Sequence, residues 1–153
     1  MKVTKEILEK YARLSVRTGM NVQPGQVVSI TASVNQVPFT MMVAEECYLA
    51  GAKRVEIDWT CDEQTRLNFK YCDEDTLSTY LPWQIAKLEQ KTKDLPFCRI
   101  FIDDDDPDAL AGIDTQKLSN VSRRRAAVAK KFRDEVDGKN QWLIIAVPSS
   151  AWA

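Results

Sequence analysis

The most concentrated set of potential metal ligands in this sequence is an acidic run, Asp103, Asp104, Asp105 and Asp106, followed by Asp108. The run comes directly after an apolar, strand-like segment, and ligand sites in open parallel sheets gather at the carboxyl ends of strands. Carboxylates placed there could hold Mg²⁺, or Ca²⁺ with additional oxygen ligands. The alternative is structural: one aspartate caps a short helix, and the others lie in solvent near the positive end of its dipole. Consecutive carboxylates also repel one another, so any cation site in the run would be weak and adventitious.

The residue that most limits the chemistry of this chain is the one it lacks, because the sequence contains no histidine. General base catalysis by histidine, Ser/His/Asp and Cys/His triads, and nearly all zinc hydrolase sites are therefore excluded for these residues. An enzyme made of this chain alone would have to use carboxylates, lysine or cysteine.

Four cysteines, Cys47, Cys61, Cys72 and Cys98, are widely spaced along the chain. None belongs to a C-x-x-C pair, which would have indicated zinc binding or a redox couple. We expect free thiols, two of them core residues, and no disulfide or metal role.

Basic and aromatic residues offer a second set of candidates. Arg123 to Arg125 are followed by Lys130, Lys131 and Arg133. Successive helical residues point about 100° apart, so the three arginines cannot all face one phosphate group, and a solvated face with some arginines paired to acids is the expected role. No glycine-rich phosphate loop follows the first predicted strand. The tryptophans Trp59, Trp83 and Trp142 are expected in the core or on a domain face.

Short apolar segments alternate with helical patterns along the chain. Strands are predicted at 27–31, 54–59, 97–102 and 142–147, with helices between them, including a long charged helix at 115–136. Two helix boundaries are predicted from single residues, a stop at Gly19 and a cap at Asn35. Near-continuous apolar strands separated by helices are typical of an α/β fold. We predict three layers, a mainly parallel sheet with helices on both faces, in a single domain over 1–153.

The overall composition is that of an ordinary globular protein, with 44% hydrophobic and 28% charged residues. A net charge of −1 and a pI near 5.6 argue against nucleic acid or an anionic membrane as a partner. No apolar stretch approaches the length of a membrane span or of a signal peptide core. A cytoplasmic protein is the expectation.

Four segments together resemble one protein family. They are LEKYARLSVRTGMNVQPGQVVSITA from Leu8, VAEECYLAGAKRVEIDWTCDEQTRLNF from Val43, DPDALAGID from Asp106 and WLIIAVPSSAWA from Trp142. In this order they are similar to the N-terminal part of the thermophilic-type metallo-aminopeptidases, the family of aminopeptidases T and S. The acidic run is longer than the family shows at this place, so it receives no shared role.

The resemblance implies a two-domain, typically dimeric enzyme that removes N-terminal residues from peptides. In that family a C-terminal domain holds two divalent metal ions, zinc or cobalt, which activate a water. The N-terminal domain supplies walls of the substrate cavity and subunit contacts. None of the metal ligands falls on a position of this sequence, so the resemblance implies a non-catalytic N-terminal domain, inactive alone and without a cofactor of its own, whose partner is the missing catalytic domain.

The last residues fit this interpretation. After the final predicted strand, Ser149, Ser150 and Trp152 would begin the passage toward the catalytic half and contact that domain or the substrate cavity. Two alternatives stay open. One is a self-sufficient, flavodoxin-like binding or interaction module without catalysis. The other is a Mg²⁺-dependent phosphotransfer domain that uses the acidic run.

Overall fold

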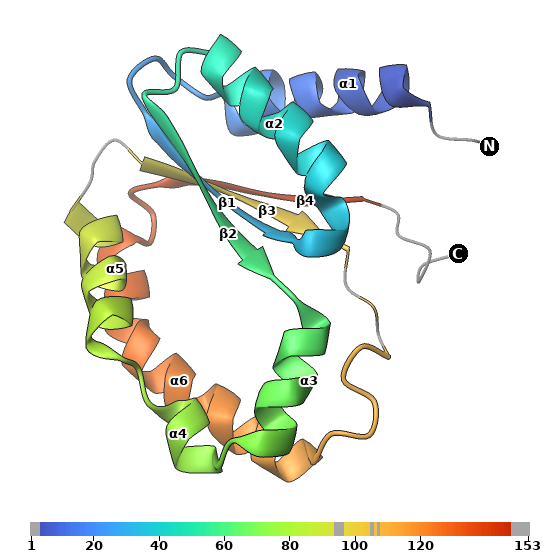
Figure 1. The fold of residues 1–153 in the computed structure, drawn as a ribbon. Helices are drawn as coiled ribbons and strands as arrows, with labels where there is room; N and C mark the ends of the chain where they lie inside the picture. The colour runs from blue at the N-terminus through green and yellow to red at the C-terminus, as the bar shows by residue number, and fades with distance from the viewer. Residues whose placement is uncertain (1–3, 94–96, 105, 107, 148–153) are drawn as a thin grey trace. The chain divides into compact units, whose positions relative to one another are not determined.

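The computed structural model of the chain describes residues 4–93, 97–104, 106 and 108–147 (Figure 1). The chain forms two compact units, each assembled from separate segments. Unit 1 comprises Met1–Thr60, Leu95–Asp106 and Asn140–Ala153, and unit 2 comprises Cys61–Asp94 and Pro107–Lys139. This division has no signature in the sequence, because no linker composition marks the points where the chain passes from one unit to the other. The single-domain interpretation stays a prediction.

Unit 1 is built on a four-stranded sheet in which all neighbouring strands are parallel. Its strands are β1 (Val27–Ser33), β2 (Arg54–Thr60), β3 (Phe97–Asp103) and β4 (Gln141–Ala146), in the order β2-β1-β3-β4. Each strand lies within two residues of its predicted bounds. The α/β fold with a mainly parallel sheet is therefore confirmed.

The register of the sheet places apolar side chains side by side on one face. Ile30 in the middle of β1 lies between Ile57 of β2 and Ile100 of β3. Ile30 and Ile100 are fully buried. Alternate residues of a strand point to opposite faces, so this register separates an apolar face from a second, mixed face.

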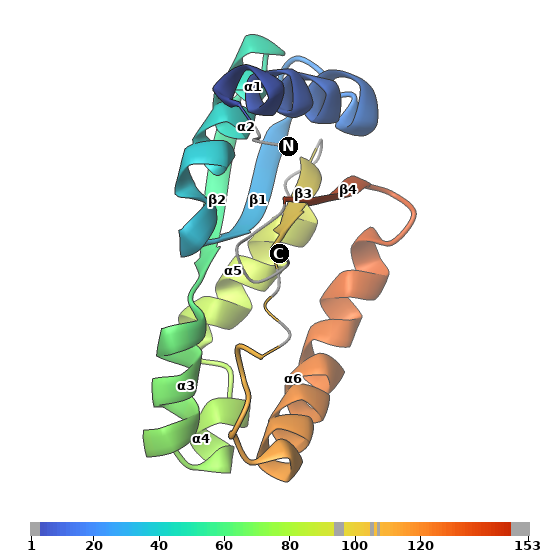
Figure 2. The same ribbon diagram turned by 90° about the vertical axis from the view of Figure 1, so that its right-hand side faces the viewer.

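Two helices and a π-helical turn belong to the apolar side of unit 1. Helix α1 (Lys5–Leu14) continues into the π-helical turn η1 (Ser15–Met20), and α2 (Val37–Leu49) connects β1 to β2. Figures 1 and 2 show α1 and α2 together on one side of the sheet. Phe39 of α2, only 2% exposed, stacks on Tyr11 of α1 with ring centroids 5.6 Å apart.

Two of the predicted helix boundaries in unit 1 are wrong. Gly19 does not stop the first helix, because η1 runs through it to Met20, and Asn21 with φ 54° ends the turn in the left-handed region. Asn35 does not cap the second helix. The N-cap of α2 is Gln36, which makes no side-chain capping hydrogen bond. Asn35 lies in a short 3₁₀ turn, η2 (Val34–Gln36), which is capped by Ser33, whose side-chain oxygen accepts a hydrogen bond from the Asn35 backbone N–H at 3.1 Å. Asparagine and serine are both good capping residues, so sequence does not decide between neighbours.

Unit 2 is entirely helical among the described residues. It contains α3 (Asp62–Tyr71), α4 (Glu74–Ser78), α5 (Pro82–Lys93) and α6 (Thr115–Val136). Asp73 caps α4 by accepting a hydrogen bond from Thr76 N–H at 2.6 Å, which lowers the pKa of its carboxyl. Asp114 caps α6 in the same way, and α6 has the predicted bounds. No described helix of the chain is both long enough and apolar enough to span a membrane.

Candidate functional site

The carboxyl edge of the sheet is the first candidate for a ligand site, because of the order of the strands. The chain crosses from β1 outward to β2 and then back to β3, so β1 and β3 lie side by side at the point where the order reverses. Ligands of open α/β sheets bind at such a point. Here the edge bears Ser33 at the end of β1 and Asp103 at the end of β3.

The acidic run begins at this edge. Asp103 is the last residue of β3, Asp104 and Asp106 follow, and Asp105 lies outside the described residues. The described aspartates of the run each make at least one non-covalent interaction within the protein. Within the described part of the chain, no group of three or more histidine, cysteine, aspartate or glutamate side chains could hold a metal ion. The weak cation site at Asp103 to Asp106 stays a prediction, as do the contacts of Ser149, Ser150 and Trp152, which also lie outside the described residues.

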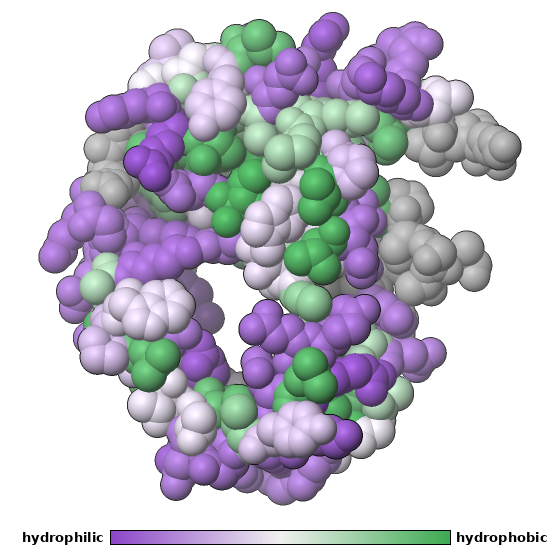
Figure 3. Space-filling model, viewed as in Figure 1, coloured by the Kyte–Doolittle hydropathy of each residue, from purple (hydrophilic) through white to green (hydrophobic). Residues whose placement is uncertain are grey.

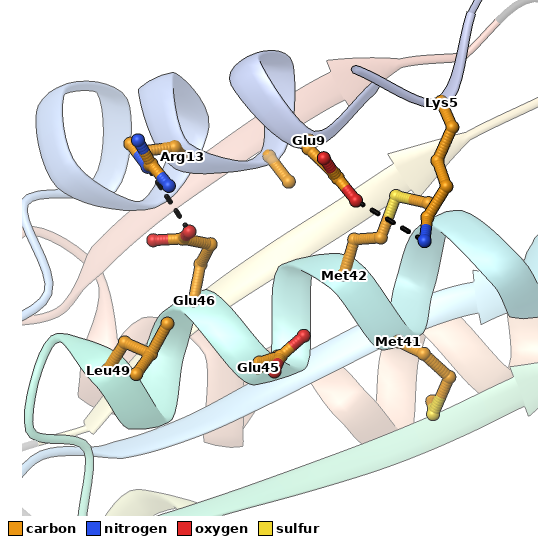
Figure 4. A pocket seen from close by; sticks show the side chains of 9 residues that line it. Lys5, Glu9, Arg13, Met41, Met42, Glu45, Glu46 and Leu49 are labelled. Atoms are coloured by element: carbon orange, nitrogen blue, oxygen red, sulfur yellow. Dashed lines mark hydrogen bonds and ion pairs between the residues drawn. The ribbon is translucent and has the colours of Figure 1, made fainter. Parts of the chain in front are cut away.

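A groove of about 360 Å³ runs between α1 and α2 (Figure 4). Its lining combines apolar and charged side chains from these two helices: Lys5, Glu9, Ala12, Arg13, Met41, Met42, Glu45, Glu46 and Leu49. Sequence reasoning missed it, because a groove between two helices depends on how they pack and not on a motif.

Most of the charged side chains that line this groove form ion pairs. Glu46, 9% exposed, lies 3.3 Å from the Nε of Arg13 and 3.6 Å from the Nε of Arg17. Lys5 pairs with Glu9 at 3.5 Å. The Glu46 carboxylate is thus engaged in ion pairs with two guanidinium groups. The groove can receive a side chain, but it does not present a catalytic set.

Helix α2 carries a stripe of exposed apolar residues, which shares Met41 and Leu49 with the groove and is interrupted by the exposed Glu45. Val37, Met41, Tyr48 and Leu49 are 41% to 62% exposed. Figure 3 shows apolar side chains over α2 on the face of unit 1 that is turned to the viewer. Exposed apolar residues gathered on one helix face are typical of a contact surface.

The mixed face of the sheet carries a second exposed apolar area, on β3 and β4. Phe101, Trp142 and Ile144 are 36%, 62% and 57% exposed. The register pairs Phe101 with Ile144 and Arg99 with Trp142, so the four side chains belong to one face. We call these four residues the Trp142 surface. The tryptophans Trp59 and Trp83 are also exposed, so all three lie on faces and none in the core.

Arg99 is the member of this surface that sequence reasoning missed. Its Nε is buried and has no hydrogen-bond partner among the described residues. The available signal was Arg99 itself, the one charged residue in the apolar run from Phe97 to Ile102. Phe97 and Phe101 lie two positions away on either side and therefore share its face of the strand. An unpaired buried donor costs free energy, so its persistence requires an explanation.

All four cysteines are free thiols, as predicted. Cys47 and Cys98 are core residues of unit 1, and burial raises the pKa of their thiols to about 12 and about 11. The two thiols also lie close enough for the charge of one to disfavour the charge of the other, which raises the Cys47 pKa further. Neither thiol is a nucleophile at neutral pH. Cys61 and Cys72, in unit 2, are half-buried.

The basic cluster of α6 forms structural contacts within unit 2. Arg124 lies 2.7 Å from Asp75 and 3.6 Å from Glu74. The Arg125 guanidinium donates to the Leu77 carbonyl and stacks over the ring of Tyr80, 3.9 Å from its centroid. The prediction of arginines paired to acids is confirmed.

A smaller hollow of about 270 Å³ in unit 2 lies between the last residues before α6 and the C-terminal half of α3. Arg66 lines it and donates hydrogen bonds to the carbonyls of Ala111 and Asp108 at 3.0 and 3.2 Å. The turn at 108–111 is closed by a hydrogen bond from Ala111 N–H to the Asp108 carbonyl. Arg66 is thus already bonded to backbone carbonyls, and Lys70 and Asp114 are the other charged residues that line the hollow.

Comparison with known proteins identifies relatives of the chain. The chain is 29% identical over 147 residues to aminopeptidase 2 of Geobacillus stearothermophilus, a match that covers 95% of this chain and 35% of the relative. It is 28% identical to aminopeptidase AmpS of Bacillus subtilis, covering 95% of this chain and 36% of that one. The chain thus spans little more than a third of the length of these relatives.

A solved structure of an aminopeptidase relative is also similar to the chain. Wild-type AmpT from Thermus thermophilus superposes with a TM-score of 0.86 at 25% identity, covering 98% of this chain and 38% of AmpT. The family model for the thermophilic metalloproteases M29 matches residues 4–153, nearly the entire chain. With a parallel α/β sheet and a family match over almost every residue, the chain belongs to the thermophilic metalloprotease family M29.

Proposed function

We propose that this chain is the N-terminal, non-catalytic part of a metal-dependent aminopeptidase that hydrolyses N-terminal residues from peptides. The observation that carries the proposal is the coverage: the M29 match extends over residues 4–153, while the chain spans only 35% to 38% of relatives named aminopeptidase. Activity, peptide substrate and metal requirement then belong to the longer protein, and this portion is inactive alone.

The residues of this chain do not fit the dinuclear zinc or cobalt site of the proposed enzyme. The sequence has no histidine, and the described residues contain no cluster of three or more candidate ligands. Metal-activated water attacks a peptide bond only where several ligands hold the ion and leave a position open. We therefore assign no catalytic step to these residues. Their proposed contribution is to form walls of the substrate cavity and contacts between subunits.

The proposal is tested by assaying two polypeptides side by side on an aminoacyl p-nitroanilide. One is this 153-residue chain, and the other is the product of the gene read past codon 153. We expect turnover by the longer product only, with loss in EDTA and recovery on adding Zn²⁺ or Co²⁺. Metal-dependent turnover by the 153-residue chain at a similar specific activity would overturn the assignment.

The homodimer implied by the family resemblance is part of the same proposal. The apolar stripe of α2, with Met41 and Leu49 43% and 62% exposed, is the surface in unit 1 that we assign to subunit contact. Light scattering of the longer product should then show a dimer, and introducing a charge by Met41→Glu should shift it toward monomer. A dimer that is indifferent to this change would place the contact elsewhere.

A second candidate function is a self-sufficient, flavodoxin-like binding module. One observation favours it: the order β2-β1-β3-β4 with all strands parallel is that of the first four strands of flavodoxin-like folds. A stop codon directly after codon 153, together with a stable monomer, would support the module. A continuing reading frame rich in spaced Glu, His and Asp would support the peptidase.

A further inference from the structure

Helices α1 and α2 of unit 1 form a layer whose outer side is open. Both helices lie on one side of the sheet (Figure 2). The connection from β1 to β2 runs in one direction along the sheet, and those from β2 to β3 and from β3 to β4 run in the other. Because crossovers between parallel strands are right-handed, α2 and the connections through unit 2 lead to opposite faces. The exposure of the α1–α2 layer is therefore a property of unit 1 by itself.

The stripe on α2 has one acid at its centre. Glu45 is exposed, with Met41 one turn before it and Leu49 one turn after it on the same face. Figure 4 shows that the other two acids of the groove, Glu9 and Glu46, are paired, whereas Glu45 forms no hydrogen bond or ion pair with a described residue. An apolar surface with a central carboxylate is complementary to an apolar surface with a central cation.

Helix α1 carries the opposite arrangement. Lys10 is exposed and lies between Ile7 and Leu14, three and four residues away, whose side chains are 44% and 58% exposed. The Lys10 ammonium pairs with Glu6 at 2.6 Å, but the two side chains are 72% and 73% exposed, and such a pair contributes little to stability. Lys10 is therefore available to an acid on another molecule.

We propose that α1 of one copy of this chain docks on α2 of a second copy, with Lys10 on Glu45 of the partner subunit. Met41 and Leu49 flank Glu45 by one turn on either side, so Leu14 meets an apolar side chain whichever way the two helices run. A two-fold axis forms the contact twice, α1 on α2 and α2 on α1, as in a C₂ dimer. The choice of a second copy as the partner rests on the proposed function, which assigns the α2 stripe to subunit contact.

The size of the layer sets the strength of this contact. Helices α1 and α2 have 10 and 13 residues, and only their outer sides are free to bind. Stable interfaces bury about 800 Å² on each partner, and smaller ones belong to weak complexes. We therefore expect a dimer of the 153-residue chain that dissociates on dilution and weakens at high salt.

The test reverses the two charges separately and then mixes the products. Lys10→Glu brings two acids together at both copies of the contact, and Glu45→Lys brings two cations together. Each variant alone should associate about tenfold more weakly in a sedimentation velocity dilution series, because two exposed pairs turn from attraction to repulsion. An equimolar mixture of the two variants should regain the dimer, since each contact then joins an acid to a cation again.

Two further variants separate this contact from general effects of charge and folding. The double variant Lys10→Glu, Glu45→Lys should associate like the unaltered chain. Lys139→Glu makes the same change of charge in unit 2, at an exposed residue, and should leave association unchanged. Circular dichroism checks that each variant is folded. If a reversal prevents folding, Lys10→Gln and Glu45→Gln probe the same contact by removing one charge at a time.

Several outcomes overturn the proposal. They are a chain that stays monomeric at every concentration, and a mixture that associates no better than its two components. A dimer that is weakened by Met41→Glu but not by charge reversal would show that the α2 stripe meets a surface other than α1. A dimer indifferent to all these changes would also overturn the assignment of the stripe to subunit contact. The peptidase assignment stands in each case, because it depends on turnover by the longer product.

Discussion

The two units of this chain are stabilised in different ways. Unit 1 contains the entire main core, whose buried members come from its sheet and from α1, η1 and α2. In unit 2, by contrast, α3 and α5 bury no described residue, and α6 buries only Val121, Phe132 and Val136. Burial of apolar area is the main stabilising term of folding. Unit 2 therefore depends more heavily on specific polar contacts.

Those contacts are cations placed on backbone carbonyls. Lys117 of α6 donates to the carbonyls of Phe69 and Cys72 at the end of α3, at 2.8 and 2.5 Å. The last carbonyls of a helix have no partner inside the helix, and a cation there also complements the helix dipole. A few side chains thus join helices that share little apolar area, and the loss of one contact should be felt locally.

The largest effect should come from the core of unit 1. Ile30→Ala removes a fully buried side chain between Ile57 and Ile100 and should lower the free energy of unfolding by about 2–5 kcal/mol. The matched control Ile7→Ala, at a side chain that is 44% exposed, should change it by less than about 0.5 kcal/mol. Urea unfolding followed by circular dichroism measures both. Equal effects would contradict the dominant role of the buried core in unit 1.

An intermediate effect is expected from the polar contacts of unit 2. Lys117→Met keeps the length of the side chain but removes its hydrogen bonds to two carbonyls, which should cost about 1.5–3 kcal/mol. Hydrogen exchange should show lower protection in α3 and α6 and unchanged protection in β1 and β3. Lys130→Met on the same helix removes only an exposed pair with Asp134 and serves as the control. Loss of protection in the strands would show that the units do not open independently.

The smallest effect should come from the thiols, which also differ between the units. In unit 1 burial raises the folded pKa values of Cys47 and Cys98 to about 12 and about 11, above the ordinary thiol value of 9.0. A raised folded pKa means that their stabilising contribution is complete below pH 9 and is lost as pH rises from there through the folded values. One pH unit above the unfolded pKa, the loss should be about 1.4 kcal/mol per thiol.

Unfolding in urea at pH 8 and pH 10 measures this loss, and the Cys47→Ala, Cys98→Ala double variant should show a flatter dependence on pH. At pH 8 a thiol reagent should label Cys61 and Cys72 of unit 2 first, because they are half-buried while the other two are core residues. Simultaneous labelling of all four would show that the core of unit 1 opens as readily as unit 2.

The backbone elements were largely predictable from the sequence. The strands and the helix at 115–136 have strong apolar periodicity or uniform β-branched composition, and such signals are local. Boundaries failed where several adjacent residues could serve, as with Gly19 and Asn21 or Ser33 and Asn35. The division into two units is a property of long-range packing, so no local pattern announced it.

The candidate surfaces were less predictable than the fold. The exclusion of histidine chemistry and the structural role of the arginine cluster followed from residue types alone. Arg99 became a candidate only when the register placed it beside Trp142 and the structure showed its Nε buried. Sequence reveals which residue types are present, whereas burial and neighbours decide which of them lack a partner.

Two tyrosines bear on how the sheet meets other molecules. Tyr48 accepts a hydrogen bond from the N–H of Val55 on β2, and Tyr11 donates one to the carbonyl of Ala146 on β4, both at 3.2 Å. These strands are the two borders of the described sheet. An exposed border is a template for uncontrolled addition of strands from other chains, the first step toward amyloid. On each border one backbone group is already engaged by a tyrosine hydroxyl, so that group cannot pair with an added strand.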